Sequence, residues 1–179
     1  APAPAPAPTV RIAKPALWAI KDADTTIYLF GTIHLLPKDV QWFQGPVKSA
    51  FDSSDALVLE MIEPPMGEMM QLMNKYGNAT DGIKLSDRMD EKTRTNYEAQ
   101  MKAIGIPSAA FEGKQPWLVY VTLYGMQLMQ SGWDVNSGAE KILTASAKGT
   151  GKPILALETA DEQFSILSGF TMDEQMAML

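Results

Sequence analysis

Three apolar runs of this chain each end on a side chain that could bind a metal or exchange a proton. The only histidine, His34, and two glutamates, Glu60 and Glu158, each directly follow such a run. The end of a strand is where a side chain can leave the core and face a ligand. Gly31, just before the histidine, lets the backbone turn or approach a ligand closely, so we predict that it lies against a bound cofactor. These four residues are the candidate site.

An imidazole and two carboxylates are suitable ligands for a hydrolytic metal centre. A divalent cation in such a site lowers the pKa of water and polarises a carbonyl group. Zinc, manganese, cobalt and iron all accept these ligands, and oxygen-rich shells favour the harder ions. We predict that His34 binds a divalent metal (Mn, Co or Zn). Glu60 is expected to bind it or to act as the general base, and Glu158 to bind it or to support a ligand.

Each of these residues also has a purely structural interpretation. His34 could be a hydrogen-bonded histidine, Glu60 could be capped by backbone N–H groups, and Glu158 could complement the positive end of a following helix. Paired-carboxylate glycosidase chemistry is a further alternative, which depends on a separation between the two glutamates that the sequence does not give. A phosphate-binding loop and a serine nucleophile are poorly supported by the spacing of the glycines and serines.

Local signals predict the elements that position these side chains. Residues 17–20 and 25–30 favour a hairpin that leads to His34, and residues 56–61 favour a buried strand. Two capping boxes mark helix starts, each formed by a threonine with a glutamate three residues later, Thr159 with Glu162 and Thr171 with Glu174. Further helices are expected at residues 46–51, 66–77, 90–104, 116–129 and 137–147.

The order of helix, glycine-containing loop and apolar strand over residues 137–158 favours an α/β fold with a mixed or parallel sheet flanked by helices. Residues 116–129 form the most apolar helix, which we interpret as a core helix or as one face of a homodimer. It is too short to cross a bilayer, and no other stretch is long and apolar enough for a transmembrane segment. The twelve methionines are interpreted as flexible core filling.

Composition narrows the function and the location. A net charge of −6 argues against a nucleic-acid binder, and the absence of cysteine excludes disulfides and thiolate sites. Residues 1–8 alternate alanine and proline, so residues 1–15 are predicted to be a linker and residues 16–179 a domain. We expect a removed signal peptide and a periplasmic or otherwise extracytoplasmic location. The last helix has scarcely begun at Leu179, so a truncated domain is also expected.

The motifs resemble those of the TraB/PrgY/GumN family, which is related to the Tiki metalloproteases. Residues 31–34 match its first Gly-x-x-His motif, and residues 56–60 fit the strand that ends on its acidic residue. A third block, residues 138–163, is similar to its middle signature, although Glu140 stands where aspartate is commoner. The resemblance covers most of residues 16–170.

The resemblance implies a Tiki-type α/β fold, related to erythromycin-esterase-like and ChaN-like proteins. It also implies a metal-dependent hydrolase, by analogy a peptidase acting on a peptide or small-molecule substrate, with His34, Glu60 and Glu158 at its site. The family's second Gly-x-x-His motif is absent from this sequence. Two rivals are a non-catalytic protein that binds haem or metal, as ChaN-like relatives do, and an accessory protein of polysaccharide biosynthesis.

Overall fold

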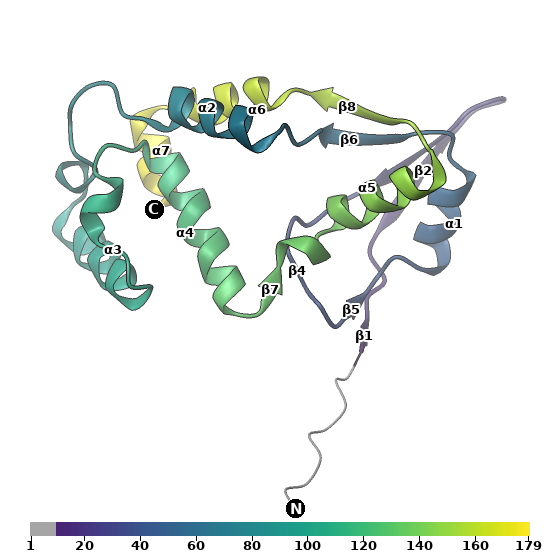
Figure 1. The fold of residues 1–179 in the computed structure, drawn as a ribbon, viewed down its shortest axis with the longest axis horizontal. Helices are drawn as coiled ribbons and strands as arrows, with labels where there is room; N and C mark the ends of the chain where they lie inside the picture. The colour runs from purple at the N-terminus through teal and green to yellow at the C-terminus, as the bar shows by residue number, and fades with distance from the viewer. Residues whose placement is uncertain (1–9) are drawn as a thin grey trace, which may run out of the picture. The chain divides into compact units, whose positions relative to one another are not determined.

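A computed structural model describes residues 10–179, so the alanine-proline alternation of residues 1–8 lies outside the described part of the chain. The chain divides into two compact units. Unit 1 comprises residues 10–59 and 128–155, and unit 2 comprises residues 60–127 and 156–179 (Figure 1). Each unit has a hydrophobic core of its own.

Unit 1 contains short strands and two helices. Their bounds are β1 Arg11–Ile12, β2 Leu17–Lys21, β3 Thr26–Phe30, β4 Leu36–Pro37, β5 Val40–Gln41, α1 Gly45–Ser53, β7 Trp133–Asp134 and α5 Ala139–Thr150. Unit 2 is mostly helical. Its elements are α2 Met66–Gly77, α3 Glu91–Ala103, α6 Ala160–Ser168 and α7 Met172–Met178. Three elements contain a boundary between the units, namely β6 Leu57–Met61, α4 Pro116–Gln130 and β8 Ile154–Glu158.

The predicted hairpin is present and leads to His34. Strands β2 and β3 pair antiparallel, with Leu17 opposite Phe30 and Lys21 opposite Thr26. The turn between them is held by Asp22, whose carboxylate accepts a hydrogen bond of 2.7 Å from the backbone N–H of Thr25. Such an Asx-type turn is a local property of the sequence, which explains why the hairpin could be predicted.

Aromatic packing anchors the end of this hairpin to the rest of unit 1. The rings of Phe30 and Trp42 stack with their centroids 5.3 Å apart, and Trp42 is almost fully buried. The core that they join brings α1 and α5 together through the buried residues Val47, Phe51, Ala139, Leu143 and Ala147. The residues just after Phe30, which include His34, therefore begin from a fixed point.

The sheets confirm the α/β class, and each of them is small. Within residues 10–179 every sheet has two strands. Strands β1 and β5 pair in parallel, whereas β2 with β3 and β4 with β7 pair antiparallel. Strands β6 and β8 form the remaining pair, and their arrows run in the same direction in Figure 1. Two parallel strands therefore deliver Glu60 and Glu158 toward the same end.

The interpretation of residues 116–129 as a core helix is only partly correct. The first turn of α4 is buried from Pro116 to Val119, but Tyr120, Val121 and Tyr124 are exposed. An apolar composition indicates that a helix can be buried, but it does not indicate which neighbouring elements cover it. The homodimer prediction for this helix stays a prediction.

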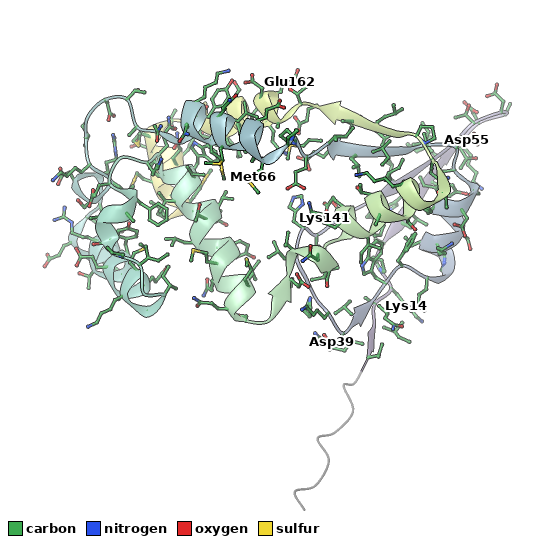
Figure 2. All side chains as sticks on the ribbon, viewed as in Figure 1. Lys14, Asp39, Asp55, Met66, Lys141 and Glu162 are labelled. Carbon is green, nitrogen blue, oxygen red and sulfur yellow. The ribbon has the colours of Figure 1, made fainter. Side chains whose placement is uncertain are left out.

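The methionines divide in a similar way. Met89 and Met101 are buried in the core of unit 2 and fill it as predicted. Met66 and Met70 of α2 are exposed at 75% and 57%, so core filling is wrong for them (Figure 2). None of the helices in the described residues is both long and apolar enough to span a membrane.

The core of unit 2 contains one buried phenol. Tyr97 of α3 is 6% exposed and donates a hydrogen bond of 2.9 Å to the backbone carbonyl of Ser108. Burial raises the pKa of the Tyr97 phenol to about 12, and the negative charge of Glu112 acts in the same direction. The neutral phenol is thus the form that the folded chain favours.

This phenol predicts an alkaline limit to the stability of unit 2. The pKa of the Tyr97 phenol is higher in the folded chain than its unfolded value of about 10. The neutral phenol therefore contributes its full stabilisation of the folded state below pH 10, and this contribution is lost as the pH rises toward 12. We expect Tyr97→Phe to cost about 1 kcal/mol at pH 7 and to remove a slope of up to about 1.4 kcal/mol per pH unit above pH 10. Urea unfolding between pH 7 and 12 measures both, with Tyr120→Phe as the exposed control. Parallel profiles for the parent and Tyr97→Phe would contradict the prediction.

Candidate functional site

The two predicted glutamates of unit 2 both accept a hydrogen bond from one side-chain amide. The Nε2 atom of Gln163 lies 2.6 Å from Oε1 of Glu60 and 3.4 Å from Oε1 of Glu158. An amide nitrogen carries two hydrogens, so it can donate one to each carboxylate. The two carboxylate oxygens can be no farther apart than the sum of these distances, 6.0 Å. The structure therefore brings together Glu60 and Glu158, as the sequence suggested, and adds Gln163.

Helix α6 positions Gln163 because it begins directly after β8. The hydroxyl of Thr159 accepts a hydrogen bond from the backbone N–H of Glu162, and the Glu162 carboxylate accepts one of 2.7 Å from the backbone N–H of Thr159. This capping box confirms the predicted helix start, and Figure 2 labels Glu162 there. Gln163 follows at the end of the first turn, so its side chain can reach back to the ends of the strands.

Contacts with α2 and α4 hold α6 in place within unit 2. The carboxylate of Asp161 accepts hydrogen bonds from Lys75 at 2.7 Å and from the Tyr76 hydroxyl at 2.9 Å. On the next turn the ring of Phe164 packs against Trp117, with the centroids 5.7 Å apart. The side chain that bridges the two glutamates therefore projects from an anchored helix.

In unit 1, His34 lies beside a glutamate that the sequence had not proposed as a site residue. The Nδ1 atom of His34 is 3.1 Å from Oε1 of Glu140, on the first turn of α5. Burial raises the pKa of the Glu140 carboxyl, but hydrogen bonds from the side chains of His34 and Thr32 outweigh it, and the pKa falls below its usual value. The carboxylate form of Glu140 is thus the one that fits this contact.

A glycine makes this approach feasible. A Cβ atom on Gly138 would overlap the backbone carbonyl oxygen of His34, so any other residue there would push the two segments apart. The backbone N–H of Ala139 also donates a hydrogen bond of 2.9 Å to the carbonyl of Ile33. The loop after β3 is therefore docked on the N-terminus of α5 by backbone and side-chain contacts together.

The four predicted site residues thus fall in two places. Gly31 and His34 belong to unit 1, whereas Glu60 and Glu158 belong to unit 2. A Cβ on Gly31 would contact nothing within 4 Å, so the protein's own packing does not require a glycine there, and its role beside a cofactor stays a prediction. Across residues 10–179, no group of three or more histidine and acidic side chains is already gathered in metal-binding geometry.

Sequence reasoning missed Gln163 and Glu140 as contact residues. Both belonged to the block that carried the family resemblance, but neither had been given a role. A usable signal was their place on the first turn of a helix, since residues there can face the strand or loop that precedes the helix. Their partners lie far away in sequence and could not be read from that signal.

The carboxylate pair limits the chemistry of unit 2. The distance of at most 6.0 Å between these two Oε1 atoms is below the roughly 6.5–9.5 Å between the carboxyl groups of an inverting glycosidase, but it includes the roughly 5–5.5 Å of a retaining one, so paired-carboxylate chemistry stays an alternative. Two converging carboxylates and an amide are also a set of oxygen donors that a divalent cation accepts.

Comparison with known proteins agrees with the motifs. A model of the TraB/PrgY/gumN family matches residues 16–179, which include both glutamates, His34 and Gln163. The chain belongs to the TraB/PrgY/gumN family. This membership confirms the resemblance that the sequence motifs suggested.

Relatives of this TraB/PrgY/gumN protein are distant. The uncharacterized protein YbaP of Escherichia coli (strain K12) is 22% identical over 153 residues, which cover 86% of this chain and 56% of YbaP. An uncharacterized protein of Treponema pallidum (strain Nichols) is 20% identical over 164 residues, covering 90% of this chain and 49% of its own length. The chain therefore spans about half the length of the curated relatives it matches. No solved structure matches it.

The close approach of Gly138 to the backbone of His34 predicts that unit 1 requires a residue without a side chain at position 138. Gly138→Ala should destabilise the protein by about 1–3 kcal/mol, because the backbone of residues 32–34 must move to admit a methyl group. Gly149→Ala on the same helix is the matched control. Its Cβ would contact nothing within 4 Å, and alanine is the better helix former, so stability should stay level or rise by up to about 1 kcal/mol. Urea denaturation compares the two, and equal free energies of unfolding would refute the requirement.

Proposed function

We propose that this TraB/PrgY/gumN protein is a metal-dependent hydrolase and that Glu60 and Glu158 bind its cation. The observation that carries the proposal is the convergence of both carboxylates on Nε2 of Gln163. The amide hydrogens supply positive partial charge at the point where the two negative groups meet. A cation such as Mn²⁺ or Zn²⁺ would satisfy the same requirement more strongly, so the donor set fits a divalent metal.

Gln163 could also take part in binding. Its side-chain amide has a carbonyl oxygen on the same carbon as Nε2, and rotation about the last side-chain bond exchanges the two atoms. With a cation between the glutamates, the oxygen would face the metal in place of the nitrogen. The first turn of α6 would then provide an oxygen donor in addition to the two strand ends.

The different exposure of Glu60 and Glu158 suggests different roles for the two carboxylates. A bound divalent cation supplies an activated water and polarises the bond that is to be cleaved. Glu60 is exposed and Glu158 is half-buried. We assign to Glu60 the general base, which takes a proton from the attacking water, and to Glu158 the fixed carboxylate that holds the geometry. His34 stays proposed as a nitrogen ligand for a divalent metal.

The substrate class and the location follow from the family resemblance and the N-terminal sequence. By analogy with the Tiki metalloproteases, we propose a Tiki-type fold and a peptide or small-molecule substrate whose carbonyl group is attacked. The alanine-proline alternation of residues 1–8 supports an extracytoplasmic location. Fractionation of the cells that naturally produce the protein would test the location.

Metal affinity tests the central proposal. We expect calorimetric titration with Mn²⁺ or Zn²⁺ to show binding by the parent chain. In Glu60→Gln and Glu158→Gln, where a charged donor becomes neutral, the affinity should fall by about tenfold or more. Glu98→Gln is the matched control, since it removes an exposed glutamate from α3 of the same unit. Equal affinities in all four proteins would refute the carboxylate site.

Gln163 provides a second test of the same pair. Gln163→Ala should reduce metal affinity less than either glutamate substitution and should lower the free energy of unfolding by about 1–2 kcal/mol, because Glu60 and Glu158 lose their shared donor. Added Mn²⁺ should recover most of that stability, which thermal unfolding with and without the metal measures. A variant whose stability does not respond to the metal would contradict the proposed site. A Soret shift on addition of haem, with no response to Mn²⁺, would favour the haem-binding rival.

A further inference from the structure

Three consecutive residues of the loop after β3 contact the first turn of α5 in unit 1. The carbonyl of Ile33 accepts a hydrogen bond of 2.9 Å from the backbone N–H of Ala139. The side chains of Thr32 and His34, on either side of it, both interact with the carboxylate of Glu140. The loop is therefore held at its backbone and at both neighbouring side chains.

Burial differs sharply between the two partners of the imidazole contact. The side chain of His34 is 72% exposed, whereas that of Glu140 is 23% exposed and its Oε1 atom is shielded from solvent. A shielded carboxylate oxygen is costly unless a donor faces it. Among the described residues this oxygen has no well-directed hydrogen bond, and the Nδ1 atom of His34 lies 3.1 Å away, within reach of becoming its donor.

A neutral imidazole has one N–H, and its position decides which nitrogen can accept a ligand. With the hydrogen on Nδ1, where a small rotation of the ring would direct it at Glu140, the lone pair belongs to Nε2. We propose that Glu140 is a positioning residue, which fixes His34 as the Nδ1–H tautomer and makes Nε2 the nitrogen presented to a ligand. Its relevance to catalysis rests on the proposed function, because metal-binding histidines commonly donate their second N–H to a carboxylate.

Gly138 is the feature that makes such positioning specific. Since a Cβ there would overlap the carbonyl oxygen of His34, the helix start and the loop are in direct backbone contact. Glu140, two residues later on the same helix, is thereby brought to the Nδ1 side of the ring. A longer separation would leave room for water between carboxylate and imidazole and would release the tautomer.

The tautomer can be read directly, because His34 is the only histidine in the chain. Two-bond ¹H–¹⁵N correlation spectra at pH 8 distinguish a protonated from an unprotonated ring nitrogen. We expect Nδ1–H to predominate in the parent chain. Glu140→Ala should return the ring to the Nε2–H form that imidazole side chains favour in water. Glu140→Gln, which keeps an acceptor oxygen of similar reach, should retain a majority of Nδ1–H.

The control is Asp52→Ala, which removes an exposed carboxylate paired with Lys48 elsewhere in unit 1 and should leave the tautomer unchanged. A predominant Nε2–H form in the parent would overturn the proposal, even if Glu140→Ala does not fold. An unchanged tautomer in folded Glu140→Ala would overturn it as well.

Zinc addition separates this proposal from the proposed function. Perturbation of Nε2 by Zn²⁺, with an affinity about 10–100-fold weaker in Glu140→Ala, would support both. An Nδ1–H tautomer that depends on Glu140, without any effect of Zn²⁺ on Nε2, would support the positioning role and would count against His34 as a metal ligand.

Discussion

In both candidate clusters of this protein a carboxylate lies beside a side chain that can donate a hydrogen bond, which offsets burial in one cluster and like-charge repulsion in the other. In unit 1 the partly buried Glu140 meets the side chains of Thr32 and His34. In unit 2 two carboxylates of like charge, Glu60 and Glu158, share the amide of Gln163. Without these donors, Glu140 would be partly buried without a partner in unit 1, and Glu60 and Glu158 would repel each other in unit 2. Hydrophobic packing such as Phe30 on Trp42 and Trp117 on Phe164 places the elements, and these polar contacts then orient the side chains.

The parts of the fold that the sequence predicted are those with local causes. The β2–β3 turn depends on Asp22 and its near neighbours, and the start of α6 depends on Thr159 and Glu162. Each such signal lies within a few residues. The contact between Gln163 and Glu60 joins residues 103 positions apart, so the sequence near one of them does not predict the other as its partner. The strand ends were predictable as places for a site, but their partners were not.

The errors in burial have a related cause. Residues 116–129 were interpreted as a core helix from composition, yet only the first turn of α4 is buried, while Tyr120 and Tyr124 stack with each other at 5.9 Å on its exposed part. Hydrophobicity is a property of one segment, whereas burial is a property of that segment with its neighbours. The prediction of a mixed or parallel sheet had a similar limit. Apolar strands such as β6 and β8 were recognised correctly, but the number of strands that pair beside them is not encoded in any single strand.

The junction between β8 and α6 has a consequence for how this family can vary. Gln163 reaches Glu158 because four residues lie between them, of which Thr159 supplies the cap and the other three belong to the first helical turn. One residue inserted into this stretch would rotate Gln163 by about 100° around the helix axis and carry it away from both strands. Exchanging residues on the outer side of that turn would leave its direction intact. Between the strand end and this glutamine, chain length should therefore be under stronger evolutionary constraint than amino-acid identity.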